Sequence, residues 1–327
     1  VGAGSAAWSP PAGQGPVWPA APDPARVRFV TAISGPHDVG AGRSWLARAL
    51  AVVVGGRRQP RFLHPRGLAT DAAGRLLIAD PDQRMVHVVD VGARKYSYLE
   101  PAPFVSPVGV AVGVDQDIYV ADSAKRRIYR YGPDGKRKTV LGVVNGEAIF
   151  SRPTGIAVAP DGRLFVVDTL ACQITVLSPG GRVLQVFGRR GAAAGEFNYP
   201  TDITVARDGR LYVVDSMNAR LQVFAADGTY LHEFGKRGNG TGDFDKPKGV
   251  AVDSDGHIYI AEAMHDVVQI FGQDGALLLV VGQSGTAAGE FSLPSALHID
   301  SSNRIFVADT LNGRVQVFQY VSRPDAH

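Results

Sequence analysis

Cysteine, long apolar runs and an excess of one charge are all scarce in this sequence. Its 327 residues include a single cysteine, Cys172, so the chain cannot form an internal disulfide. No apolar run approaches the roughly 20 residues that cross a bilayer as a helix. The net charge is +3, from 34 basic and 31 acidic residues, which is too small to indicate a nucleic-acid-binding protein.

Local catalytic motifs are absent as well. The sequence has no glycine-rich phosphate loop, no G-x-S-x-G elbow, no C-x-x-C pair and no H-x-H or H-E-x-x-H pairing. Glycine and proline, by contrast, are abundant at 39 and 21 residues, which indicates a chain with many turns.

These turns belong to an internal repeat. A proline that opens an apolar run ending on a carboxylate occurs six times, at spacings of 42, 46, 47, 47 and 47 residues. The prolines are Pro65, Pro107, Pro153, Pro200, Pro247 and Pro294, and the carboxylates are Asp80, Asp122, Asp168, Asp215, Glu262 and Asp309. Each period contains four short β-rich runs, which is typical of propeller blades rather than helical solenoids.

The clearest copy of the repeat covers residues 197–243. Its dipeptides Asp208-Gly209 and Asp227-Gly228 each separate two β-rich runs, and the glycine supplies the positive φ of a hairpin turn. This copy therefore predicts four strands, at 201–206, 210–215, 220–225 and 229–235.

The last copy stops after three strands, at Phe318, and would leave an unpaired edge. Residues 26–33 alternate polar and apolar side chains at period two, so they predict the missing outer strand of blade six. Pairing of these two ends would close the ring without a covalent link. The sequence therefore predicts an all-β fold, a monomeric six-bladed β-propeller.

The repeat resembles the NHL family of propellers. The resemblance is carried by the F-x-x-P element and by the runs VVDSMNARLQVF at 213–224 and VADTLNGRVQVF at 307–318, and it covers residues 62–319. It departs from the pattern where Asp202 and Ala296 replace the glycine of positions 67, 109, 155 and 249. The chain looks most similar to exported bacterial NHL-repeat proteins of unassigned function.

Related propellers leave an enzymatic reading open. Some lyases of this general fold bind zinc through three histidines, and some lactonases bind calcium through Glu, Asp and Asn. Four histidines of this chain lie near predicted loops but at unlike points of the repeat, and no repeat position supplies the calcium ligands. These histidines are His37, His64, His265 and His298. The sequence predicts no catalytic residue, no metal site and no cofactor.

The remaining segments define the domain organisation. Residues 1–25 are rich in Pro, Ala and Gly and predict a flexible tether, 26–320 a single propeller domain, and 321–327 a tail. A serine cap, an apolar stripe and a glycine stop predict a short helix over 44–54, in the connection before blade one. The chain begins without a methionine, and together with the tether and the resemblance this predicts an extracytoplasmic bacterial protein, with or without a lipid anchor.

The carboxylate that ends each second strand is predicted to be structural, because Asp side chains bond backbone N–H groups of loops and six catalytic acids in a ring would serve no chemistry. Residues beside each proline should instead line one mouth of the propeller. They are often basic and never acidic, which favours an anionic partner. With the helix, they give these candidate binding residues: His64, Arg66, Arg152, Thr154, Tyr199, Lys246, Lys248 and Trp45.

Three functions follow from these features. The main prediction is a non-enzymatic scaffold of an envelope or electron-transfer assembly, which binds a protein partner through the basic mouth. The alternative is a metal-dependent lyase or hydrolase with a histidine-based site at the channel mouth. The third is single-stranded RNA binding, for which Tyr199 and the basic loops supply few stacking platforms.

Overall fold

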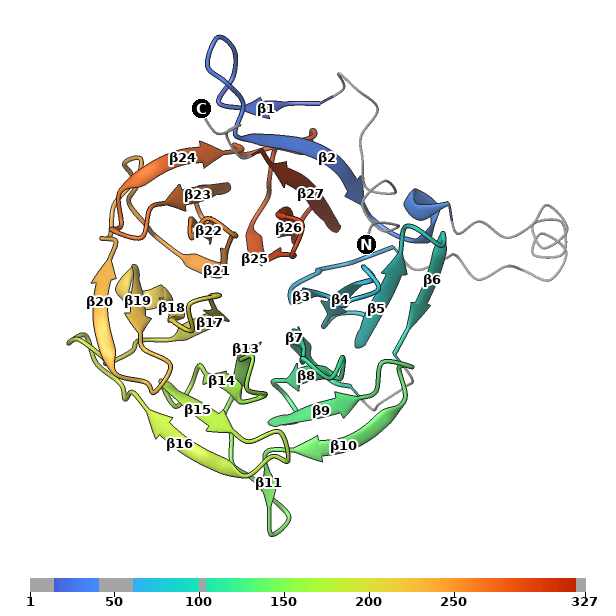
Figure 1. Cartoon of the computed structure of the whole chain (residues 1–327), viewed down its shortest axis with the longest axis vertical. Coiled ribbons are helices and arrows are strands. Elements are labelled where there is room, and N and C mark those ends of the chain that lie inside the picture. Colours follow the sequence, from blue (N-terminus) through green and yellow to red (C-terminus); the bar gives the residue numbers. More distant parts are fainter. Residues whose placement is uncertain (1–14, 41–60, 100–103, 322–327) are drawn as a thin grey trace, which may run out of the picture.

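The computed structural model describes residues 15–40, 61–99 and 104–321. These residues form a six-bladed β-propeller in which the sheets stand radially around a central axis (Figure 1). The predicted fold class is therefore confirmed.

Each blade is an antiparallel meander whose first strand lies beside the axis. Blade one contains β3 (Leu68–Thr70), β4 (Leu76–Asp80), β5 (Met85–Asp90) and β6 (Lys95–Tyr98), and blade two contains β7 (Pro107–Val112), β8 (Ile118–Asp122), β9 (Arg127–Tyr131) and β10 (Arg137–Leu141). Blade three contains β13 (Pro153–Val158), β14 (Leu164–Asp168), β15 (Gln173–Leu177) and β16 (Val183–Phe187), and blade four contains β17 (Pro200–Val205), β18 (Leu211–Asp215), β19 (Arg220–Phe224) and β20 (Tyr230–Phe234). Blade five contains β21 (Pro247–Val252), β22 (Ile258–Glu262), β23 (Val267–Phe271) and β24 (Leu277–Val281).

Blade six is assembled from both ends of the chain. It contains β25 (Pro294–Ile299), β26 (Arg304–Asp309), β27 (Arg314–Tyr320) and β2 (Val27–Ile33). Strand β2 pairs antiparallel with β27, from Val27 opposite Tyr320 to Ile33 opposite Val315, as the sequence predicts.

A fifth strand extends this blade outward. Strand β1 (Val17–Trp18) pairs with β2, and the Trp18 ring meets Phe318 edge-on at 5.7 Å. Part of the segment that the sequence assigned to a flexible tether is therefore built into the sheet.

The repeated carboxylates have the predicted structural role. All six are buried, and each accepts hydrogen bonds from backbone N–H groups of the loop before its blade. Asp168, for example, accepts from Ser151 N at 2.6 Å, Arg152 N at 2.9 Å and Ala171 N at 3.2 Å. Each carboxylate thereby fixes the chain just ahead of the proline that enters the channel.

Apolar side chains fill the wedges between neighbouring blades. The second strand of every blade is buried along its length. Four of the loops that join one blade to the next also contain a fully buried phenylalanine. These phenylalanines are Phe150, Phe197, Phe244 and Phe291. The core is thus a ring of contacts between blades, as expected for a repeat that cannot bury its faces alone.

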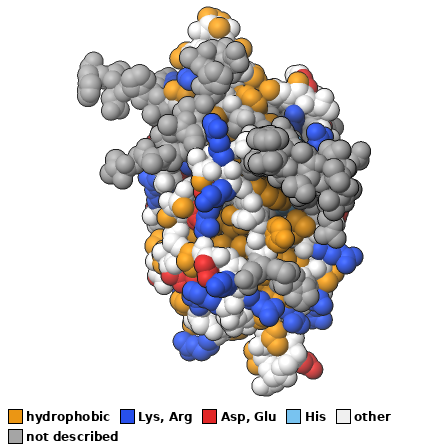
Figure 2. All heavy atoms as spheres, turned by 90° about the vertical axis from the view of Figure 1, so that its right-hand side faces the viewer, with side chains coloured by type: hydrophobic (Ala, Val, Ile, Leu, Met, Phe, Trp, Pro, Cys, Tyr) orange, Lys and Arg blue, Asp and Glu red, His pale blue; other side chains and the backbone are white. Residues whose placement is uncertain are grey.

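Other elements are short. Strands β11 (Val143–Val144) and β12 (Glu147–Ala148) form a hairpin after blade two, and 3₁₀ turns occur at Pro36–Val39 and Ser216–Asn218. The predicted helix over 44–54, including Trp45, lies outside the described residues. Within the described ranges no helix has the length and apolar character to span a membrane. On the rim beside β6, basic side chains stand out and acidic ones are sparse (Figure 2).

Candidate functional site

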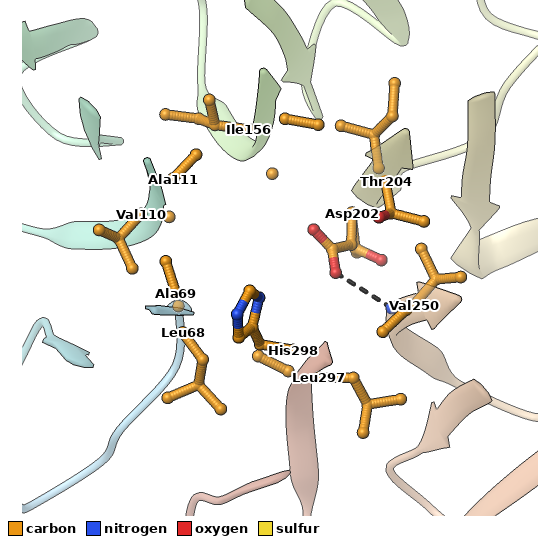
Figure 3. Close-up of a pocket in the computed structure, with 18 of the residues that line it drawn as sticks. Leu68, Ala69, Val110, Ala111, Ile156, Asp202, Thr204, Val250, Leu297 and His298 are labelled. Atoms are coloured by element: carbon orange, nitrogen blue, oxygen red, sulfur yellow. Dashed lines mark hydrogen bonds between the residues drawn. The ribbon is translucent and has the colours of Figure 1, made fainter. Parts of the chain in front are cut away.

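The first strands of all six blades surround a central cavity of about 580 Å³. The first strands contribute glycine, alanine and branched aliphatic side chains to its wall (Figure 3), and polar and charged groups line it as well. A cavity of this volume suits a small molecule.

The repeated glycine of the first strand keeps the blades close around the axis. A Cβ at Gly109 would lie 2.1 Å from the Thr154 carbonyl oxygen, and one at Gly249 would lie 2.7 Å from Ala296 Cα. Blade four departs from this rule because Asp202 occupies the position. Its carboxyl group projects into the cavity among aliphatic side chains (Figure 3).

Few groups around Asp202 stabilise the negative charge of its carboxylate. Its Oδ2 accepts a hydrogen bond from Val250 N at 3.1 Å, and no ion pair to it is found among the described residues. Burial disfavours the carboxylate and raises the pKa of Asp202 to about 7, although the backbone N–H groups of Val250 and Ile203 offset part of the shift. The group can therefore both accept and donate a proton near neutral pH.

His298 extends from β25 of blade six into the same cavity (Figure 3). Its Nε2 accepts a hydrogen bond from Thr70 N at 3.1 Å and lies 2.8 Å from Thr70 Oγ1. Because a backbone N–H can only donate, the neutral ring carries its proton on Nδ1. Burial lowers the pKa of His298 to about 4, so the ring is neutral at pH 7.

Three cations lie where the first strands begin. Arg66, Arg152 and Lys248 all line this end of the cavity, and among the described residues none of their side chains forms an ion pair within 4.0 Å. Burial lowers the pKa of Lys248, the charges of Arg66, Lys246 and Arg152 lower it further, and the nearby Glu262 offsets part of that shift. The pKa of Arg66 is also lowered, by burial and by Arg152, while Asp82 offsets part of that shift.

The other predicted site residues are divided between the cavity and its rim. Thr154 and Tyr199 line the cavity, where Thr154 Oγ1 lies 2.8 Å from Thr169 Oγ1 and Tyr199 lies beneath Arg190 at 5.5 Å. His64 is bonded to Asp82, and Lys246 Nζ lies 3.2 Å from Met217 Sδ. Neither His64 nor Lys246 lines the cavity, and Trp45 is not among the described residues.

The cavity does not fit a resident metal ion. Across the described residues, no three His, Cys, Asp or Glu side chains gather in a way that could hold one. Asp202 and His298 come from different blades, and the His298 Nε2 is already occupied by Thr70. The donors of the zinc and calcium propellers are therefore not reproduced here.

Fold and cavity together define a six-bladed propeller whose channel holds Asp202 and His298, here called the polar pair, and a basic mouth. A family model described as the SMP-30/gluconolactonase/LRE-like region matches residues 67–286. This match covers more than half of the chain, and the protein belongs to that family. The NHL propellers that the repeat resembles carry a related but different family label. A comparison with curated proteins finds no match.

Solved structures show the same fold at low sequence identity. A gluconolactonase from Xanthomonas campestris is 20% identical, with a TM-score of 0.62 over 94% of this chain and 98% of that one. A streptogramin B lyase is 14% identical, with a TM-score of 0.61 over 80% and 94% of the two chains. A virginiamycin B lyase from Staphylococcus aureus, solved with quinupristin as a catalytically inactive histidine-to-alanine variant, is 15% identical, with a TM-score of 0.59 over 79% and 95%.

The prediction of a non-enzymatic scaffold is wrong. The matching family and these structural relatives are gluconolactonases and lyases, which favours the enzymatic alternative. The scaffold prediction rested on missing local motifs. A propeller gathers its site from strands of different blades, so local motifs are a poor guide to its chemistry.

The sequence marks both residues of the polar pair as unusual but does not indicate a role for either. Asp202 departs from the repeated glycine, and a departure of this kind indicates that the strand has a role specific to its blade. His298 was visible only as a histidine at an unusual point of the repeat. What the sequence could not supply is that both side chains point toward the axis.

Proposed function

We propose that the protein is a lactone or ester hydrolase that acts by general acid–base chemistry in the central cavity. The observation that carries the proposal is Asp202, a carboxyl group in place of the repeated glycine, with its pKa raised to about 7 inside the channel. Family membership supports the reaction class, because its description names gluconolactonase.

The two polar side chains have complementary parts in this reaction. The Asp202 carboxylate accepts a proton from water as the water oxygen bonds to the carbonyl carbon. The neutral His298 donates its Nδ1–H hydrogen bond to the carbonyl oxygen, which gains negative charge. Protonated Asp202 then returns the proton to the leaving oxygen as the carbon–oxygen bond breaks, so the product is a hydroxy acid or an acid and an alcohol.

The burial of Asp202 and His298 strengthens both steps. A hydrogen bond from a buried group to developing charge stabilises that charge more than the same bond in bulk solvent. A histidine is needed for activity in at least one structural relative, since the virginiamycin B lyase variant with a histidine replaced by alanine is described as catalytically inactive.

The test is hydrolysis of a panel of sugar lactones and aryl esters by the purified full chain, with the Asp202→Asn variant beside it. Asparagine keeps the shape and the hydrogen bond from Val250 N but cannot take up a proton, so we expect a loss of kcat of about 100-fold or more. The melting temperature should be retained. A chelator should leave the rate unchanged, because the described residues offer no metal-binding set.

Asp208→Asn is the matched control. Asp208 lies in the turn at the other end of β17 and is paired with Arg210 on the surface. Its replacement should leave the rate intact. Full activity of Asp202→Asn, or an activity abolished by the chelator and restored by a metal ion, would refute the proposed chemistry.

A further inference from the structure

The basic mouth holds more positive charge than its surroundings neutralise. Arg66 belongs to blade one, Arg152 to blade three and Lys248 to blade five. Alternate blades of a six-bladed ring lie about a third of a turn apart, so the three cations approach the axis from three directions. Their charges act on one another, as the lowered pKa of Lys248 indicates. Repulsion between these like charges destabilises the folded protein unless an anionic ligand neutralises them.

A hydroxyl group at the same mouth is left without a partner. After the carboxylate of the second strand, three blades carry a Ser or Thr whose hydroxyl bonds the carbonyl of the next blade's proline. These bonds are Ser123 to Pro153 at 2.5 Å, Thr169 to Pro200 at 2.7 Å and Thr310 to Pro65 at 2.9 Å. Ser216 of blade four occupies the equivalent position and lines the cavity, yet its Oγ is buried with no partner among the described residues.

We propose that this mouth binds the phosphoryl group of a small phosphorylated molecule, held by Arg66, Arg152 and Lys248, with Ser216 Oγ as a further donor once the serine side chain rotates toward the ligand. The proposal deepens the proposed function, on which it rests for the statement that the same molecule is the substrate. The phosphoryl group would occupy the mouth, and the rest of the molecule would extend along the channel toward Asp202.

The geometry and the charge favour a phosphoryl group over a carboxylate. A terminal phosphoryl group presents three oxygens around one axis and carries a charge near −2 at neutral pH, which matches cations arriving from three sides. A carboxylate is planar, has two oxygens and carries one charge. The cations also lie on the wall of a cavity about 580 Å³ in volume, which suits a small molecule rather than a polymer.

The experiment measures binding without turnover. Inorganic phosphate is titrated into the full chain by calorimetry and by thermal shift, against sodium chloride of equal ionic strength. Glucose 6-phosphate and glucose provide a pair that differs only in the phosphoryl group. We expect saturable binding of phosphate and of the sugar phosphate, a rise in melting temperature with each, and no response to glucose.

Arg152→Gln and Lys248→Gln should each weaken phosphate binding by about tenfold, as expected for the loss of a charge-assisted hydrogen bond. Without phosphate, neither variant should melt below the wild type, because each relieves repulsion. Ser216→Ala should weaken phosphate binding without loss of stability. Arg207→Gln is the matched control, since Arg207 lines the opposite end of the same cavity and its removal should not change phosphate affinity.

The outcomes separate this inference from the proposed function. Hydrolysis without any phosphate response would overturn the phosphoryl site and leave the hydrolase intact. Phosphate binding that is lost equally in Arg207→Gln would reduce the site to general attraction by a basic channel, and the proposal would be wrong. Specific phosphate binding without hydrolysis of any lactone or ester would support the site and contradict the hydrolase.

Discussion

At position 202 a carboxyl group stands where four of the other five blades have only a hydrogen atom. The substitution buries an ionisable group beside the axis, and the fold compensates it with a hydrogen bond from Val250 N rather than with a cation. A structural role would be served better by the glycine that the neighbours keep. Residues that break a local rule without a structural gain are where function is expected.

The pKa of Asp202 predicts how activity depends on pH. Hydrolysis requires the carboxylate, which is the minor form below pH 7 and the major form above it. We therefore expect kcat/KM to rise between pH 5 and pH 8 with a midpoint near 7 and then level off. His298, whose pKa lies at about 4, stays neutral throughout and adds no second step. A pH profile of lactone hydrolysis checks this, and a rate that is flat from pH 5 to pH 8 would exclude Asp202 as the base.

At this scale the sequence predicted chemistry only in part. Five of its eight candidate residues line the cavity, whereas His64 and Lys246, which also lie beside a repeated proline, do not. The direction of a side chain at such a point is set by strand pleat and by the bulge after the proline, which a repeat alignment does not specify. The same limit hid Asp202 and His298.

Among the elements, the second strand of each blade holds the mouth in place. Its terminal carboxylate binds the loop that enters the channel, so the cation Arg152 is positioned through the hydrogen bond from its backbone N to Asp168. Six such anchors make the mouth a rigid rim rather than a set of separate loops.

Replacement of Asp168 by alanine should destabilise the protein by about 3 kcal/mol, because three backbone N–H groups lose a buried charged acceptor. Chemical denaturation measures this change. Asp274→Ala is the control, since Asp274 accepts one bond from Ala276 N in an exposed turn and its loss should cost well under 1 kcal/mol. Equal effects of the two variants would show that the carboxylate is not an anchor.

The elements themselves were the most predictable level. The period of about 47 residues, the Asp-Gly turns and the alternation within each run all favour the same fold. Because these local signals agree, the fold of the repeat can be predicted from the sequence. Blade one is the exception, because its first strand, β3, has only three residues. The hairpin of β11 and β12 was missed because it lies between two blades and repeats nowhere else.

For the whole molecule, the joint between β2 and β27 keeps the ring closed. Deletion of residues 1–33 would expose the full edge of β27 and leave blade six with three strands, so we expect a large fall in melting temperature or aggregation. Deletion of residues 1–25 removes β1 but keeps β2, and should cost much less. Thermal melts and size-exclusion chromatography compare the two, and equal losses would show that pairing with β27 is not what holds the ring.

The pairing of β2 with β27 also determines when the ring can close during synthesis. Ile33 pairs with Val315, which leaves the ribosome 282 residues later. At roughly 10 residues per second, strand β2 waits about half a minute for its partner β27. During that interval blade six does not exist, the channel lacks one wall, and neither β25 nor His298 is in place. The site can therefore form only after residues 294–320 have been made, so a chain that stops before β25 would carry Asp202 but no complete cavity around it.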